Sequence, residues 1–131
     1  MSYYHSRRTP RSFDEAVART REALKAEHFG VITEIDIAQT FKQKLDVDFR
    51  PYVILGACNP AAAYDALKTE DKVGVMLPCN VIIQASPSGE GCEIAAVDPV
   101  ASMSAIDNPA LTARAEEIGA SLRRAIDAAV T

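Results

Sequence analysis

The chain has 131 residues, enough for one domain and too few for two ordinary ones. Hydrophobic residues make up 48% and charged residues 24%, a balance that excludes intrinsic disorder and low-complexity sequence. The formal charge of −4 argues against a nucleic-acid partner, and no apolar run is long enough to cross a membrane. We therefore expect a single globular domain over residues 1–131 with neither kind of partner.

The cysteines and the N-terminal segment indicate a compartment. The three cysteines are Cys58, Cys79 and Cys92, an odd number for a disulfide framework. The segment MSYYHSRRTPR is basic, but no apolar run of signal-peptide length follows it. We expect a cytoplasmic protein whose thiols are reduced.

The N-terminal third predicts a strand followed by a helix. Residues 2–8 have the composition of an edge strand. Ser12 and Glu15 form a capping box that begins a helix over 13–28, and Gly30 is placed for its left-handed C-terminal cap.

The next segment alternates strands with short helices. Residues 31–35 predict a second strand, and Asp36 caps a short helix with apolar residues at helical spacing, namely Ile37, Phe41 and Leu45. The continuous apolar run Tyr52–Cys58 is typical of a strand buried on both faces. Asn59-Pro60 then predicts a helix from Pro60 to about Lys68.

The C-terminal half predicts a hairpin and a long helix. Residues 73–76 resemble the start of a strand, and 79–85 and 91–97 are two strands joined by a turn. A loop over 100–107 leads to a helix over 109–130, whose apolar stripe is Leu111, Ala115, Ile118, Leu122, Ile126 and Ala129. The predicted fold is an α+β sandwich with helices on one face of a partly antiparallel sheet.

This arrangement leaves one face of the sheet without cover. The helices 13–28 and 109–130 occupy the first face, yet Tyr52–Cys58 has the pattern of a strand buried on both. A second copy of the chain is the economical cover, so we expect a symmetric homodimer.

Two short motifs resemble a known family. Gly56–Pro60 (GACNP) and Leu77–Val81 (LPCNV), with the segment 29–36 and Val97-Asp98-Pro99, resemble the bacterial family called domain of unknown function 302, and the resemblance covers Tyr3 to Ala129. It implies a β-α-β4-α sandwich with a mostly antiparallel sheet, similar in shape to half of the TATA-binding protein, and dimeric members. The resemblance does not imply any activity for this chain.

Cys58 and Cys79 are the candidate catalytic residues. Cys58 ends a strand and precedes a helix N-terminus, whose free N–H groups and dipole stabilise a thiolate. Cys79 comes close to Cys58 if the two strands are antiparallel, and such a pair can bind a soft cation, form a disulfide or attack an electrophile. The alternative is that both are small core residues, the expected role of Cys92.

Three further residues are candidate ligand-binding groups. Asn59 and Asn80 directly follow the two cysteines, and His5 can complete a Cys/Cys/His site if the sheet brings it near. A solvent-facing histidine on an edge strand is the alternative for His5. No motif names a cofactor or a metal.

Three functions are compatible with these residues. The first is a small binding protein that holds a small-molecule ligand or a soft metal near Cys58 and Cys79. The second is a thiol-dependent redox enzyme with Cys58 as nucleophile and Cys79 as resolving thiol. The third is an interaction module in which the cysteines only pack.

Overall fold

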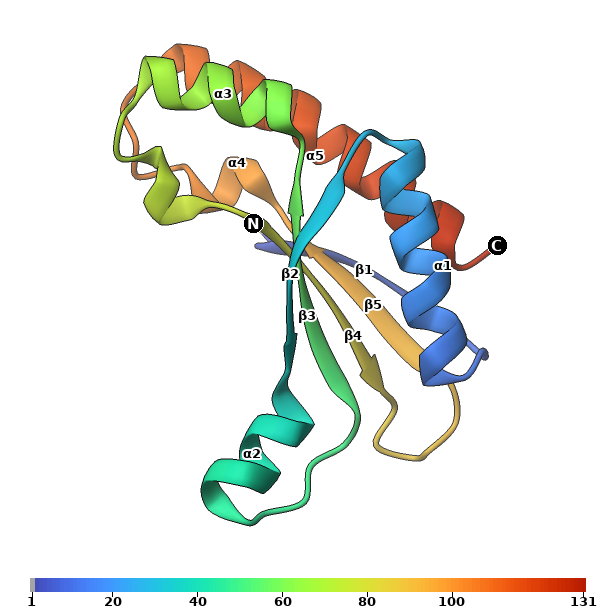
Figure 1. Cartoon of the computed structure of the whole chain (residues 1–131). Helices are drawn as coiled ribbons and strands as arrows, with labels where there is room; N and C mark the ends of the chain where they lie inside the picture. Colours follow the sequence, from blue (N-terminus) through green and yellow to red (C-terminus); the bar gives the residue numbers. More distant parts are fainter. Residues whose placement is uncertain (1) are drawn as a thin grey trace.

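The computed structural model describes residues 2–131 and consists of one antiparallel sheet with helices against it (Figure 1). The strands are β1 (Tyr4–Thr9), β2 (Gly30–Asp36), β3 (Tyr52–Cys58), β4 (Cys79–Ala85) and β5 (Cys92–Val97). They lie in the order β1-β5-β4-β3-β2, and every neighbouring pair is antiparallel. The predicted α+β class is confirmed.

The helices are α1 (Phe13–Ala26), α2 (Ile37–Leu45), α3 (Pro60–Thr69), α4 (Pro99–Ser102) and α5 (Pro109–Ala129), with a 3₁₀ turn η1 (Val73–Met76). Within residues 2–131, none of these helices is long and apolar enough to cross a membrane.

Three helices begin at an Asn-Pro or Asp-Pro pair. The side chains of Asn59, Asp98 and Asn108 accept hydrogen bonds from main-chain N–H groups of the first turn that follows each of them. Proline suits the first helical position because the N–H it lacks has no partner there. The pair at Asp98 begins α4 inside the segment predicted as a loop, so that part of the prediction is wrong.

Two other local predictions are also wrong. Residues 73–76 form η1 and not the start of a strand. Helix α1 ends at Ala26, and the left-handed residue after it is His28, with φ of 68°, while Gly30 already belongs to β2. The chain therefore turns two residues earlier than the glycine signal indicates.

The core lies between the sheet and the two longest helices. Helices α1 and α5 lie side by side against the same face of the sheet (Figure 1). Alternate strand residues point into this layer, and the largest fully buried side chains are Leu24, Leu55, Ile83, Ile94, Leu122 and Ile126. Every second residue of the central strands therefore faces the helices.

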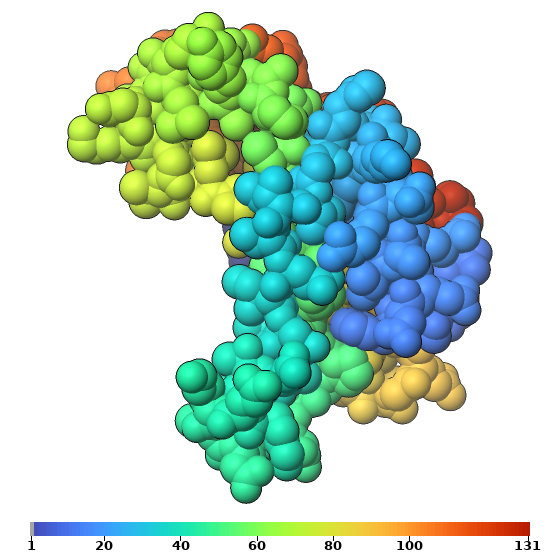
Figure 2. Space-filling view, viewed as in Figure 1, coloured from blue at the N-terminus to red at the C-terminus, as the bar shows by residue number. Residues whose placement is uncertain are grey.

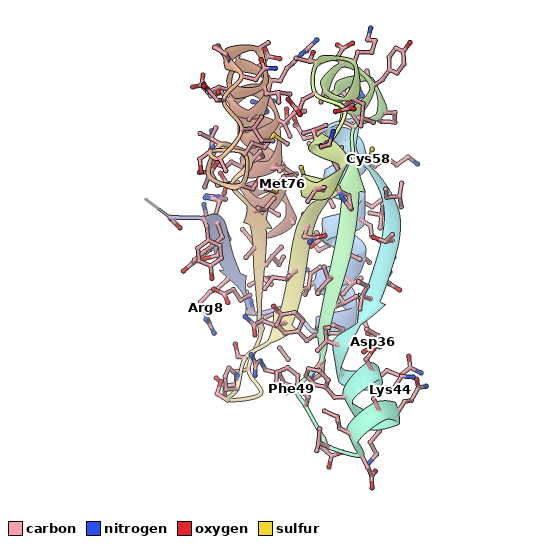
Figure 3. All side chains as sticks on the ribbon, turned by 90° about the vertical axis from the view of Figure 1, so that its left-hand side faces the viewer. Arg8, Asp36, Lys44, Phe49, Cys58 and Met76 are labelled. Carbon is pink, nitrogen blue, oxygen red and sulfur yellow. The ribbon has the colours of Figure 1, made fainter. Side chains whose placement is uncertain are left out.

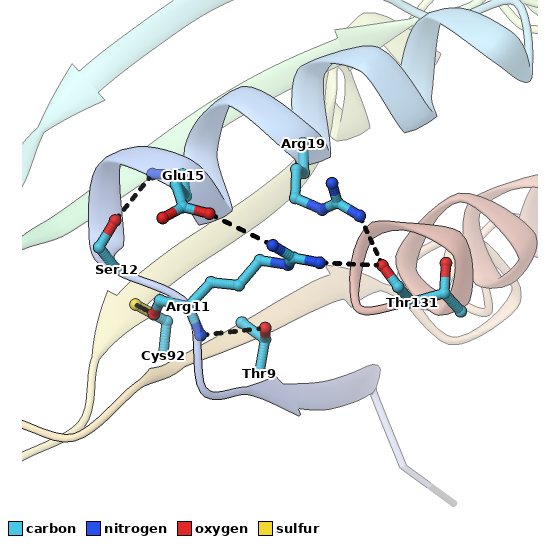
Figure 4. Close-up of polar contacts among 7 residues, drawn as sticks. All are labelled: Thr9, Arg11, Ser12, Glu15, Arg19, Cys92 and Thr131. Atoms are coloured by element: carbon cyan, nitrogen blue, oxygen red, sulfur yellow. Dashed lines mark hydrogen bonds and ion pairs between the residues drawn. The ribbon is translucent and has the colours of Figure 1, made fainter.

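Two arginines, one just before α1 and one within it, hold α1 to the end of α5 (Figure 4). Arg11 and Arg19 both donate to the main-chain oxygen of Thr131, at 3.5 and 2.6 Å. Arg11 also pairs with Glu15, one turn into α1, at 3.3 Å. The two helices are thus joined by polar contacts at the rim of the core as well as by apolar packing.

The second face of the sheet is not covered by any helix of residues 2–131. Tyr52, Ile54 and Ile82 lie on this face and are only partly buried, while Val53, Leu55 and Ala57 of the same β3 strand are buried beneath the helices. Figure 2 shows that the molecule is hollowed on this side, between the lobe that carries α3 and the arm formed by α2. We call it the open face.

The helix-facing stripe of α5 can be tested by two neighbouring substitutions. Leu122 is 1% exposed, whereas Arg123 is exposed on the next position of the helix. We expect Leu122→Ala to lower the free energy of unfolding by about 2–5 kcal/mol. Arg123→Ala should change it by no more than about 0.5 kcal/mol. Equal urea midpoints for the two variants would contradict this assignment.

Candidate functional site

A pocket opens where β3 ends and β4 begins, and both predicted cysteines line it. Its volume is about 50 Å³, and its wall is mainly apolar. The strand ends contribute Cys58 and Cys79, and α3 and α5 contribute alanines and Arg114. Figure 3 shows Cys58 at the end of the sheet from which α3 starts, opposite the end that carries Phe49 and Lys44.

The antiparallel register of β3 and β4 brings Cys58 and Cys79 to the same edge of the sheet, although their side chains leave adjacent positions of the ladder on opposite faces. Ala57 is the direct partner of Cys79, and Cys58 is the next residue along β3. Antiparallel neighbours place the end of one strand beside the start of the next, so a connection of twenty residues returns the chain to the same edge. The sequence analysis expected Cys79 near Cys58 only if the two strands were antiparallel, and they are.

Cys58 occupies the junction between β3 and α3. The side-chain oxygen of Asn59 accepts a hydrogen bond from the Ala62 N–H at 3.1 Å and caps the helix. Cys58 therefore lies one residue before the cap, and its side chain is half-buried, in contrast to the other two cysteines. It is the thiol most accessible to solvent.

Cys79 and Cys92 are buried and behave differently from Cys58. Burial, together with a smaller contribution from the nearby Cys58, raises the pKa of the Cys79 thiol to about 11. Burial also raises the pKa of Cys92, which lies under α1 with its Sγ 3.6 Å from the Arg11 carbonyl oxygen (Figure 4). Both stay protonated at neutral pH, because burial penalises the charged thiolate.

Gly56 allows the start of β4 to approach β3 closely. A Cβ at this position would lie 2.7 Å from Cγ of Pro78 and would overlap the hydroxyl of Thr33. Pro78 also lines the pocket and directly precedes Cys79. The GACNP motif thus supplies the Cys58 thiol and also requires a residue without a side chain at Gly56.

Two of the predicted ligand-binding residues lie away from the pocket. His5, on β1, bonds to Asp127 of α5 at 2.9 Å, and Arg7 reaches the same carboxylate at 3.1 Å. Asn80 lies opposite Gly56 on the open face. Of the predicted site residues, the structure brings together Cys58, Cys79 and Asn59, and it separates His5 and Asn80 from them.

Sequence reasoning does not find most of the residues that line the pocket, among them Met103 and Arg114. Met103 ends α4, and Arg114 lies on α5, where it pairs with Asp65 of α3 and with Glu117 at 3.5 Å. The Asp98-Pro99 pair is a usable signal for α4, because the same pattern at Asn59-Pro60 predicts α3. No local signal places Arg114 near the cysteines.

The pocket does not hold a set of ligands for a hard cation or for zinc. Across residues 2–131, no three His, Cys, Asp or Glu side chains lie close enough together to bind one metal ion. A zinc site usually needs three or four such ligands.

Comparison with known proteins agrees with the paired motifs and the fold. The family described as domain of unknown function DUF302 matches residues 5–129. The chain belongs to the DUF302 family. A crystal structure of an uncharacterized conserved DUF302 protein from Bacillus stearothermophilus shares 28% sequence identity, with a TM-score of 0.90 over 98% of each chain. A search of curated proteins gave no match.

The three thiols of this DUF302 protein should react with iodoacetamide in a fixed order. Cys58 is accessible and should be alkylated first at pH 7, whereas Cys92, 2% exposed, should be last. Since the thiolate is the nucleophile, alkylation of Cys79 should accelerate about tenfold per pH unit below its pKa. Peptide mapping after timed labelling measures all three rates. A native protein in which Cys92 labels before Cys58 would refute the described environments.

Proposed function

We propose that this DUF302 protein is a small binding protein whose ligand occupies the pocket beside Cys58 and Cys79. The supporting observation is that two cysteines from neighbouring strands, Cys58 and Cys79, line one mainly apolar cavity. A concave apolar site with a few polar or reactive groups is the usual form of a small-ligand site. The volume suits a ligand of a few heavy atoms, in a cytoplasm that keeps both thiols reduced.

The redox alternative is less well supported. A resolving thiol must become a thiolate to attack the oxidised partner, and Cys79 has a pKa of about 11. At neutral pH only a very small fraction of Cys79 is therefore competent for that step. Binding does not require a free thiolate, so the same burial is compatible with the binding proposal.

Xenon provides a test of the pocket that needs no knowledge of the natural ligand. This apolar atom enters dry apolar cavities. We expect xenon to shift the amide NMR signals of Ala57, Ala66 and Cys79, which border the cavity. Ala63→Leu places a larger side chain in the cavity and should abolish the shifts.

Ala61→Leu is the matched control for the xenon experiment. Ala61 is an exposed residue of the same helix and does not line the pocket, so this variant should keep the xenon response. Both variants should retain the native spectrum in the absence of xenon. A native protein with no xenon response at these amides would overturn the proposal.

We also propose that the protein acts as a homodimer formed through the open face and α2. Helix α2 has nine residues, and not one of them is buried. A helix this short is marginal in water unless it packs on something. The arm formed by α2 and the segment after it also exposes Leu45, Val47 and Phe49.

The arm and the hollow fit as the two halves of a symmetric contact. The hollow of the open face is about 440 Å³ and is bordered by Tyr4, Tyr52, Ile82 and Val97. Both the projecting arm and the hollow lie on the same side of the molecule (Figure 2). A two-fold axis lets each copy place its apolar arm against the partner's open face, which covers both apolar surfaces at once.

A charge on the arm should separate the two copies. Leu45 is 65% exposed, so Leu45→Asp leaves the core of the chain intact. We expect the native protein to have twice the mass of the chain by light scattering, and Leu45→Asp to shift it to the single-chain mass at micromolar concentration. Gln43→Asp adds the same charge on the opposite side of α2 and should remain dimeric. A native protein that is monomeric and stably folded would refute the dimer.

A further inference from the structure

Among residues 2–131, Arg114 is the one charged residue that lines the pocket. The rest of the wall is apolar except for one amide and the two cysteines. Helix α3 contributes three alanines to it, Ala62, Ala63 and Ala66. In a mainly apolar cavity, the few polar groups fix the orientation of the ligand. The charge of Arg114 is therefore the feature that indicates the class of ligand.

The Arg114 guanidinium has donors that its protein partners do not use. One of its nitrogens donates to Asp65 of α3, and another reaches Glu117 at 3.5 Å. The Glu117 side chain is 71% exposed, and an exposed ion pair of this length contributes little. Since a guanidinium carries five N–H donors in a planar fork, Arg114 can bind a second carboxylate in addition to that of Asp65.

Positive charge also prevails beside the pocket. A hollow of about 320 Å³, bordered by α3 and α5, shares Ala66, Leu111 and Arg114 with the pocket. Lys68 and Asp65 also line this hollow, and Asp65 pairs with both cations, with Lys68 at 3.5 Å. Two positive side chains against one negative side chain favour an anion at this position.

Two other polar groups of the pocket are compatible with an anion. Burial raises the pKa of the Cys79 thiol to about 11, so this side chain is neutral at neutral pH. The side-chain oxygen of Asn59 already accepts the Ala62 N–H, which leaves the N–H groups of this amide as donors. Hydrogen-bond donors and a neutral thiol suit a ligand that accepts hydrogen bonds.

The apolar part of the pocket limits the size of the ligand. Its volume of about 50 Å³ is well below the roughly 150 Å³ of a cavity that admits benzene. An apolar tail that fits there has only a few carbon atoms. Alanine, leucine and proline side chains offer this tail an aliphatic surface.

We propose, on the basis of the binding function above, that the ligand is a short aliphatic carboxylate. The carboxylate accepts hydrogen bonds from the Arg114 guanidinium, and the tail lies against the alanines of α3. No covalent bond is made or broken. The two cysteines contribute only surface to the cavity, so their sulfur atoms need not face a common point.

Isobutyrate and isobutyramide are matched probes, because they share a carbon skeleton and differ in charge. We expect isobutyrate to bind the native full chain about tenfold more tightly than isobutyramide at pH 7, because charged hydrogen bonds are the stronger ones. Titration of the amide NMR signals of Ala57 and Ala66, which border the cavity, measures both affinities. Arg114→Gln should bind the two probes equally.

Arg124→Gln is the matched control. Arg124 is also an exposed arginine of α5 held in an ion pair, with Glu27, and it lies outside the pocket. This variant should keep the preference for isobutyrate, whereas Ala63→Leu fills the cavity and should abolish binding of both probes. Because both arginines are exposed, neither glutamine variant should unfold, which its amide spectrum verifies.

The outcomes distinguish the class of ligand from the binding function. Three results would overturn the carboxylate assignment: no binding of either probe, equal affinity of the native chain for both, or a preference for isobutyrate that survives Arg114→Gln. If xenon still enters the native pocket in that case, the binding function stands with a ligand of another class. If the chain binds neither xenon nor the probes, both proposals fail.

Discussion

Six residue pairs join β3 to β4 in antiparallel register, from Tyr52 opposite Gln84 to Ala57 opposite Cys79. This ladder determines the candidate site, because it fixes where Cys58 and Cys79 lie along the two strands. A shift by one residue would turn every side chain of one strand to the other face, and Cys79 would no longer point toward the helices. Gly56 supports the register, since a larger residue there would collide with Thr33 and Pro78. The pocket is thus a consequence of strand pairing at the centre of the sheet.

The distribution of apolar residues about the sheet is uneven, and this unevenness underlies both proposals. One face is closed by α1 and α5, and the alternating residues of β3 that point there are fully buried. On the other face, Tyr52 and Ile54 are only partly covered. The proposed ligand pocket lies at an end of the closed side, where helix and strand ends leave a cavity. The open side is the surface on which we propose that the second copy of the chain packs.

Much of the fold follows from local signals that do not depend on distant residues. Caps and periodicity predicted the starts of α1, α2, α3 and α5, because N-terminal capping involves residues within one turn. Residues 73–76 were assigned wrongly, since a short apolar run has the same composition in a strand and in a 3₁₀ turn. Arg114 was missed for another reason, as it reaches the pocket only through the packing of α5 beside α3. Tertiary contacts of this kind cannot be predicted from the spacing of residues along the sequence.

The pairing of β1 with β5 has a consequence for folding. Tyr4 lies opposite Val97, so β1 joins the sheet only after a loop containing most of the chain has closed, which is entropically slow. Until then β5 presents an unpaired edge, which is a template for strand addition by other chains. His5 and Arg7, both bonded to Asp127 of α5, fasten β1 over that edge once it is in place. These contacts therefore hold the edge strand to the helix layer, a role separate from ligand binding.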